Sequence, residues 1–115
     1  MGGTLAFGAA CGLGDRIAAS ACYYGGRIQT LLPMAAGIKG PVRVFYGGLD
    51  TFIPPEEVEA VRSGLAALDL DAEVVLYPDA DHGFCNEARA EVYDGDAADD
   101  SWARTLEMFG RALAA

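Results

Sequence analysis

Residues 42–54 read Val-Arg-Val-Phe-Tyr-Gly-Gly-Leu-Asp-Thr-Phe-Ile-Pro. The run begins after Gly40-Pro41, and its β-branched and aromatic residues give way to Gly47-Gly48. A short apolar run with turn residues on both sides is typical of a strand that is buried on both faces. Pro55 and the glutamates that follow it favour the first turn of a helix. This segment therefore predicts a strand, a loop that carries one carboxylate, and a helix.

The rest of the chain repeats this alternation. Two further strands are expected at residues 17–24 and 73–77, the second ending at Pro78. Helices are expected at residues 3–11, from residue 55 to about 68, and near the C-terminus, while residues 27–38 are ambiguous and predict one or two helical turns. The last helix is expected to have Asp100 or Ser101 as its N-terminal cap. Its core-facing side is expected to be an apolar stripe of Trp102, Leu106, Phe109 and Leu113. The pattern predicts an α/β fold with about three parallel strands flanked by helices.

Length and composition exclude several classes of protein. The 115 residues suffice for a single domain, residues 1–115, and 8 basic against 17 acidic residues give a net charge of −9. This charge argues against nucleic acid and anionic membranes as partners. No run approaches the ~18 apolar residues of a membrane span. Three cysteines without a CxxC pair, and no basic stretch at the N-terminus, predict a cytoplasmic protein with reduced thiols.

Two side chains that could carry chemistry follow neighbouring strands. Asp50 comes four residues after Tyr46, and His82, the single histidine, comes shortly after Tyr77. The carboxyl ends of parallel strands meet at one edge of a sheet, and an acid followed by a histidine matches the end of the order Ser, Asp, His in α/β-hydrolases. The alternatives are an aspartate that only forms a turn, a solvated histidine, or a metal site that includes Asp79 and Asp81.

Four segments carry a resemblance to a known family. They are Tyr23-Tyr24-Gly25, residues 48–54, Tyr77-Pro78-Asp79-Ala80-Asp81-His82-Gly83-Phe84, and residues 93–106 with Tyr93-Asp94 and Trp102-Ala103-Arg104-Thr105-Leu106. Together they resemble the dienelactone hydrolase family, from Met1 to about Leu113. The resemblance implies a partial α/β-hydrolase fold, a Cys-His-Asp or Ser-His-Asp triad, an ester or lactone substrate, and no cofactor or metal. It also implies that Asp50 is the triad acid and His82 the base.

The nucleophile departs from this pattern. The family places it in a Gly-x-Cys/Ser-x-Gly-Gly elbow, of which Met1-Gly2-Gly3 match only the last three positions. The nucleophile would therefore fall immediately before Met1, and the upstream strands are likewise expected to be missing. Cys11 is expected within a helix and Cys22 within a buried strand, which makes both unsuitable as substitute nucleophiles. Cys85, three residues after His82, is the least unsuitable of the three cysteines.

Two functions from different classes remain open. One is an ester or lactone hydrolase whose nucleophile this chain lacks, so that the isolated chain is expected to be inactive. The other is a non-catalytic remnant or assembly module, which self-associates as a homo-oligomer through the exposed first strand near Ala18.

Overall fold

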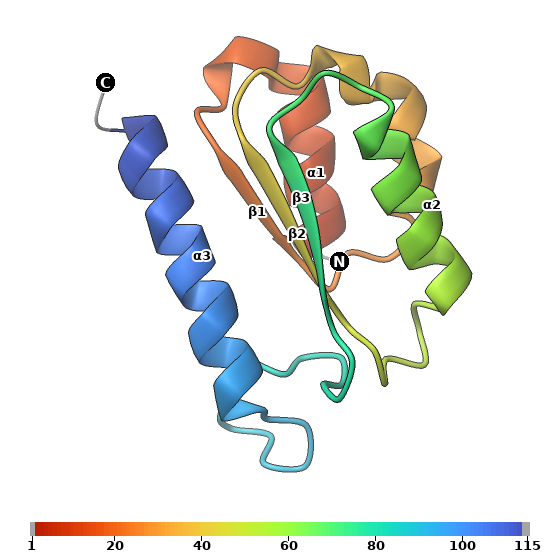
Figure 1. Ribbon diagram of the computed structural model, residues 1–115, viewed down its shortest axis with the longest axis vertical. Helices are drawn as coiled ribbons and strands as arrows, with labels where there is room; N and C mark the ends of the chain where they lie inside the picture. The colour runs from red at the N-terminus through yellow and green to blue at the C-terminus, as the bar shows by residue number, and fades with distance from the viewer. Residues whose placement is uncertain (1, 114–115) are drawn as a thin grey trace.

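The computed structural model describes residues 2–113, which form three layers with a parallel sheet in the middle (Figure 1). In chain order the elements are α1 (Gly2–Leu13), η1 (Gly14–Arg16), β1 (Ser20–Tyr23), η2 (Ile28–Gly37), β2 (Val42–Gly47), α2 (Pro55–Ala66), β3 (Ala72–Tyr77) and α3 (Gly95–Leu113). The ambiguous segment at 27–38 is thus mostly a 3-10 helix with Pro33 inside it. The predicted α/β class is confirmed.

The three strands lie in the order β1-β2-β3, and both pairings are parallel. Ser20 pairs with Val42 and Val42 with Ala72, so the strands start level and their carboxyl ends reach the same edge of the sheet. β2 is buried along almost its whole length, as its continuous apolar run predicts. This alignment brings the loops that follow β2 and β3 together.

β1 is shorter than the sequence predicts. The ladder begins where the Ser20 N–H donates to the Pro41 carbonyl at 3.0 Å. Pro41 has no N–H with which to continue the pairing toward Ala18. Ala18, which was expected to lie in the exposed strand, therefore lies outside it, and the open edge is formed by residues 20–23.

Successive residues of β2 point into two separate cores. Val42, Val44 and Tyr46 face α1, η2 and α2, where they pack with Phe7, Ile28, Val58 and Val61. Phe45 faces the other side, where it packs with Phe84 and Ala97 and against Tyr23, Val75 and Tyr77. The period-two alternation of a strand is what divides these side chains between the layers.

α3 buries a different face from the one its sequence predicts. Its buried residues are Ala97, Ser101, Thr105 and Met108. The expected stripe is largely exposed, with Trp102 at 58%, Leu106 at 50% and Leu113 at 70% of full exposure. Small side chains at 97, 101 and 105 let the helix approach the large rings of Phe45 and Phe84, and the Thr105 hydroxyl lies 3.1 Å from that of Tyr23. The expected cap is also wrong, because the helix starts earlier and Asp94 accepts the Ala97 N–H at 3.1 Å.

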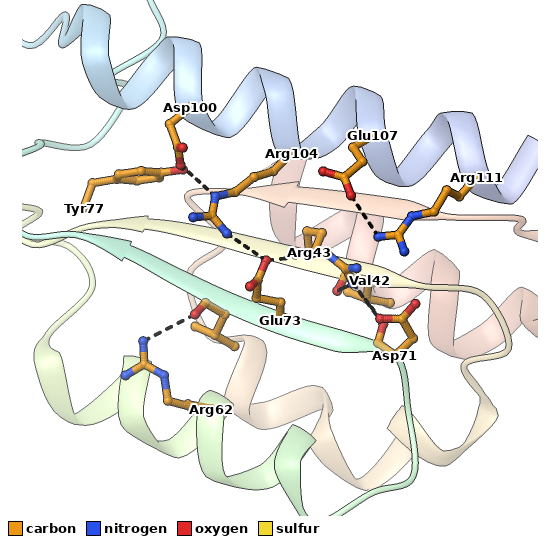
Figure 2. A network of polar contacts seen from close by, with 11 residues as sticks. Val42, Arg43, Arg62, Asp71, Glu73, Tyr77, Asp100, Arg104, Glu107 and Arg111 are labelled. Carbon is orange, nitrogen blue, oxygen red and sulfur yellow. Dashed lines mark hydrogen bonds and ion pairs between the residues drawn. The ribbon is translucent and has the colours of Figure 1, made fainter.

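A polar network joins α3 to the sheet (Figure 2). Arg104 of α3 connects the two layers. Its Nε atom lies 2.7 Å from Asp100 on the same helix, and its Nη1 atom lies 3.2 Å from Glu73 on β3. Asp100 also accepts the Tyr77 hydroxyl at 2.6 Å, and Glu73 reaches Arg43 of β2 at 3.6 Å. Charged and aromatic groups thus supply much of the contact between these layers.

Within residues 2–113, no helix is both long and apolar enough to cross a membrane.

Candidate active site

Asp50 lies in the loop that follows β2, and its side chain is almost wholly buried, with 1% exposed. Its Oδ1 atom accepts the Phe52 N–H at 2.8 Å, and its own N–H donates to the Gly47 carbonyl at 3.3 Å. The first bond is an Asx turn, which fixes the carboxylate and leaves Oδ2 free to bind a second group. The turn-forming and catalytic interpretations of Asp50 are therefore compatible.

The loops after β2 and β3 are bound together by their backbones. The Gly48 N–H donates to the Tyr77 carbonyl at 2.7 Å, and the Leu49 N–H donates to the Ala80 carbonyl at 2.8 Å. A Cβ atom on Gly47 would lie 2.5 Å from the Ala80 oxygen, and one on Gly48 would lie 2.5 Å from the Pro78 oxygen. Only glycine permits this close approach, which sets the distance between the two candidate residues.

His82 lies on the second of these loops, with its Nδ1 atom 2.5 Å from Asp50 Oδ2. Its backbone N–H donates to Asp81 Oδ1 at 2.7 Å, and 34% of its side chain is exposed. A carboxylate can only accept hydrogen bonds, so this contact places the proton of the neutral ring on Nδ1 and leaves Nε2 unprotonated. The structure thus brings together the two residues predicted from the sequence and holds the ring in the tautomer that a general base requires.

Two aromatic residues flank the imidazole. The ring centroid of Tyr24 lies 5.2 Å from that of His82, and the centroid of Phe52 lies 5.6 Å from it. Tyr24 has φ 52, in the left-handed region, and its hydroxyl accepts the Cys85 N–H at 3.1 Å. No function was predicted for Tyr24 from its sequence pattern. Its place at the carboxyl end of β1, the same edge as Asp50, is the signal that could have found it.

None of the three thiols is arranged as a nucleophile for this histidine. Cys11 and Cys22 are buried, and burial raises the pKa of both thiols, that of Cys22 to about 12. Cys85 is partly buried, and its Sγ atom lies 3.6 Å from the Ser101 hydroxyl of α3. The elbow expected from the sequence involves Met1, which lies outside the described residues.

The acidic residues near His82 form no metal site within the described residues. Asp81 binds the backbone of His82 rather than its ring, and the part of the chain from Gly2 to Leu113 holds no group of three side chains placed to bind a metal ion.

The profile of the dienelactone hydrolase family matches residues 1–113. The chain belongs to the dienelactone hydrolase family. A relative named "Putative carboxymethylenebutenolidase" from Escherichia coli O157:H7 is 43% identical over 76 residues, which are 66% of this chain and 28% of the relative. "Protein usf" of Aquifex pyrophilus is 33% identical over 108 residues, 94% of this chain and 46% of that protein.

The fold agrees with that of a solved member. The crystal structure titled as a putative dienelactone hydrolase from Klebsiella pneumoniae subsp. pneumoniae MGH 78578 matches with a TM-score of 0.83 and 32% identity. The match covers 94% of this chain and 48% of that one. The predicted partial α/β-hydrolase fold of the dienelactone hydrolase family is thereby confirmed, and the chain spans about half the length of this member.

Proposed function

We propose that this chain carries the acid–base half of an acyl-transfer site that acts on small esters or lactones, with Asp50 as the triad acid and His82 as the base. The observation that supports the proposal is the contact of 2.5 Å between His82 Nδ1 and the buried Oδ2 of Asp50. The names of the dienelactone hydrolase relatives point to the same chemistry.

The geometry suggests a role for each group. Nε2 of His82 takes the proton of a Cys thiol or Ser hydroxyl as that group attacks the substrate carbonyl. The buried carboxylate of Asp50 stabilises the imidazolium that results and keeps its orientation. The imidazolium then protonates the leaving alkoxide, and a water molecule, deprotonated by the same nitrogen, hydrolyses the acyl-enzyme. The nucleophile belongs to the Gly-x-Cys/Ser-x-Gly-Gly elbow of the family, which Met1-Gly2-Gly3 match in part.

The test uses a fusion in which the residues that precede the matched region of the Klebsiella relative are joined to this chain. We expect hydrolysis of p-nitrophenyl acetate by the fusion, and we expect His82→Ala to lower kcat by at least about 10³-fold. Asp79→Ala is the matched control, because this carboxylate lies on the same loop and has no hydrogen bond to the His82 ring. A His82→Ala fusion that hydrolyses the ester as fast as the unchanged fusion would contradict the assignment of His82 as the base.

The chain without the fused segment gives a second measurement. We expect it to hydrolyse the ester no faster than its own His82→Ala variant. A clear excess that disappears in Cys85→Ala would move the nucleophile to Cys85.

The open edge of β1 favours one other function, that of an assembly module. In that case the chain would sediment as a homo-oligomer at micromolar concentration, and the fusion would show no hydrolysis. A monomer with an active fusion excludes this alternative.

A further inference from the structure

A cavity of about 400 Å³ lies between the end of β1, the loop that precedes α3, and the first turns of α3. We call it the Trp102 cavity; its lining residues are Tyr23, Tyr24, Cys85, Glu87, Tyr93, Ala98, Asp99 and Trp102. Neither Asp50 nor His82 lines it, although the Tyr24 ring borders the cavity and also lies beside the imidazole. The volume is within the range of small-molecule sites, about 300–1,000 Å³. The cavity is therefore large enough for a ligand of its own, next to the candidate active site.

The walls of the cavity are mainly aromatic, from Tyr23, Tyr24, Tyr93 and Trp102. The rings of Tyr23 and Tyr24 meet edge to face, with their centroids 5.6 Å apart. The hydroxyls of both have partners within the protein, since that of Tyr23 lies 3.1 Å from the Thr105 hydroxyl and that of Tyr24 accepts the Cys85 N–H at 3.1 Å. What these rings offer a ligand is therefore chiefly π surface.

The charged side chains that line the cavity are both negative. Glu87 of the loop and Asp99 of α3 are exposed, and neither takes part in an ion pair within residues 2–113. Arg89, two residues after Glu87, pairs instead with Glu91 at 3.1 Å. Partial burial and the charges of Glu87 and Asp99 raise the pKa of the Tyr93 hydroxyl. The two carboxylates thus give the aromatic cavity a negative potential that the described part of the chain does not neutralise.

This combination selects an organic cation. The face of an aromatic ring attracts a cation within about 6 Å of its centroid, and Trp attracts it most strongly. A primary ammonium group needs acceptors for its three N–H donors, whereas a quaternary ammonium group has no donors and surrounds its charge with methyl groups that suit an apolar wall.

We propose that the Trp102 cavity binds a small quaternary ammonium compound, with the aromatic rings around its methyl groups and Glu87 and Asp99 beside its charge. The proposal goes beyond the hydrolysis assigned to Asp50 and His82 and does not depend on it.

The experiment titrates the ¹⁵N-labelled chain with choline chloride at constant ionic strength. We expect saturable shifts of the indole N–H of Trp102, the chain's single tryptophan, and of the Cys85 and Tyr93 amides, with a Kd on the order of 1 mM. The neutral isostere 3,3-dimethylbutan-1-ol should bind at least about tenfold more weakly, and ethanolamine at least about threefold more weakly. Shifts that do not saturate, or equal binding of choline and either control compound, would overturn the proposal.

Variants locate the site on the aromatic wall. Trp102→Leu should weaken choline binding at least about threefold, read at the Cys85 and Tyr93 amides. Its fold is expected to survive because Trp102 is 58% exposed. Leu106→Ala is the matched control, because Leu106 is 50% exposed on the same helix and does not line the cavity. A Trp102→Leu variant that binds choline as tightly as the unchanged chain would contradict the site.

A second pair of variants separates local charge from net charge. Glu87→Gln combined with Asp99→Asn should weaken choline binding at least about threefold. Glu56→Gln combined with Asp69→Asn removes the same number of charges from exposed positions that do not line the cavity. Equal weakening by both pairs would mean that only the net charge of −9 attracts the cation, and the proposal would fail.

The fusion with the preceding residues of the Klebsiella relative tests the other possible occupant, a preceding segment of chain. We expect choline to shift the Trp102 signal in the fusion as it does in the chain alone. A folded fusion that has lost this shift would show that the preceding segment fills the cavity, which overturns the proposal.

None of these readouts measures hydrolysis. His82→Ala should bind choline with an unchanged Kd, so the cation site and the proposed function can fail separately.

Discussion

His82 is the single histidine of the chain, so its ring can be observed without assignment. Its Nδ1 contact with Asp50 places the proton of the neutral ring on that nitrogen. The same contact limits rotation of the ring, because Asp50 is itself held by the Phe52 N–H. Orientation and tautomer thus follow from one buried carboxylate.

We predict that ¹⁵N NMR of the neutral ring shows a protonated Nδ1 and an unprotonated Nε2. Asp50→Asn should weaken this preference, because an amide can present either a donor or an acceptor to the ring. Asp81→Asn, which alters a contact with the backbone N–H only, is the control. Observation of the Nε2-protonated tautomer in the unmodified chain would contradict the hydrogen bond on which the site is built.

Among the elements, α1 depends on a contact between backbones. A Cβ atom on Gly3 would lie 2.1 Å from the carbonyl oxygen of Tyr23, and one on Gly25 would lie 3.1 Å from the carbonyl carbon of Gly3. The first turn of the helix therefore packs directly on the end of β1, beside the residue whose ring contacts His82. The glycine at position 3 thus lets the helix expected at residues 3–11 pack against backbone rather than side chains.

We predict that Gly3→Ala lowers the free energy of unfolding by about 1–3 kcal/mol, because the methyl group must displace backbone. Gly12→Ala, in the same helix and with nothing within 4 Å of the added atom, should instead raise it by up to about 1 kcal/mol through helix propensity. Urea unfolding followed by circular dichroism measures both. Similar changes in the two variants would refute the close contact.

Over the whole molecule, the layers are held together by different forces. α1, η2 and α2 share a large apolar core with the sheet, whereas α3 contributes small residues and a charged network (Figure 2). The Tyr77 hydroxyl and Arg104 hold the pKa of Asp100 below its ordinary value of 3.8. A depressed carboxyl pKa stabilises the folded state above the ordinary value, and this contribution is lost as the pH falls through the lowered one.

We therefore predict that acid loosens α3 before the rest of the fold. The protection of the α3 amides, taken relative to the intrinsic exchange rate at each pH, should fall below about pH 4. Asp100→Asn should remove most of this pH dependence while lowering stability by less than about 1 kcal/mol, because the network is partly exposed. Asp99→Asn is the control, since its carboxylate takes no part in the network. An unchanged pH profile in Asp100→Asn would show that the network does not hold the helix.

The sequence was sufficient to predict that three strands and α2 form and that Asp50 and His82 lie close together. These features depend on local residue patterns and on the rule that parallel strands end at the same edge of a sheet. Apolar runs between turn residues specify strands, and parallel strands bring their carboxyl ends to one edge. Asp50 and His82 could therefore be paired although 32 residues separate them.

The buried face of α3, the extent of β1 and the place of Tyr24 depended on tertiary contacts. Periodicity identifies an apolar stripe but not the surface that covers it. Here the small residues of α3 pack against the aromatic side of the sheet, so Trp102 and Leu106 stay exposed. β1 starts at Ser20 because Pro41, 21 residues later, lacks an N–H. Each of these outcomes is set by a partner distant in the chain, and local sequence patterns carry no information about such partners.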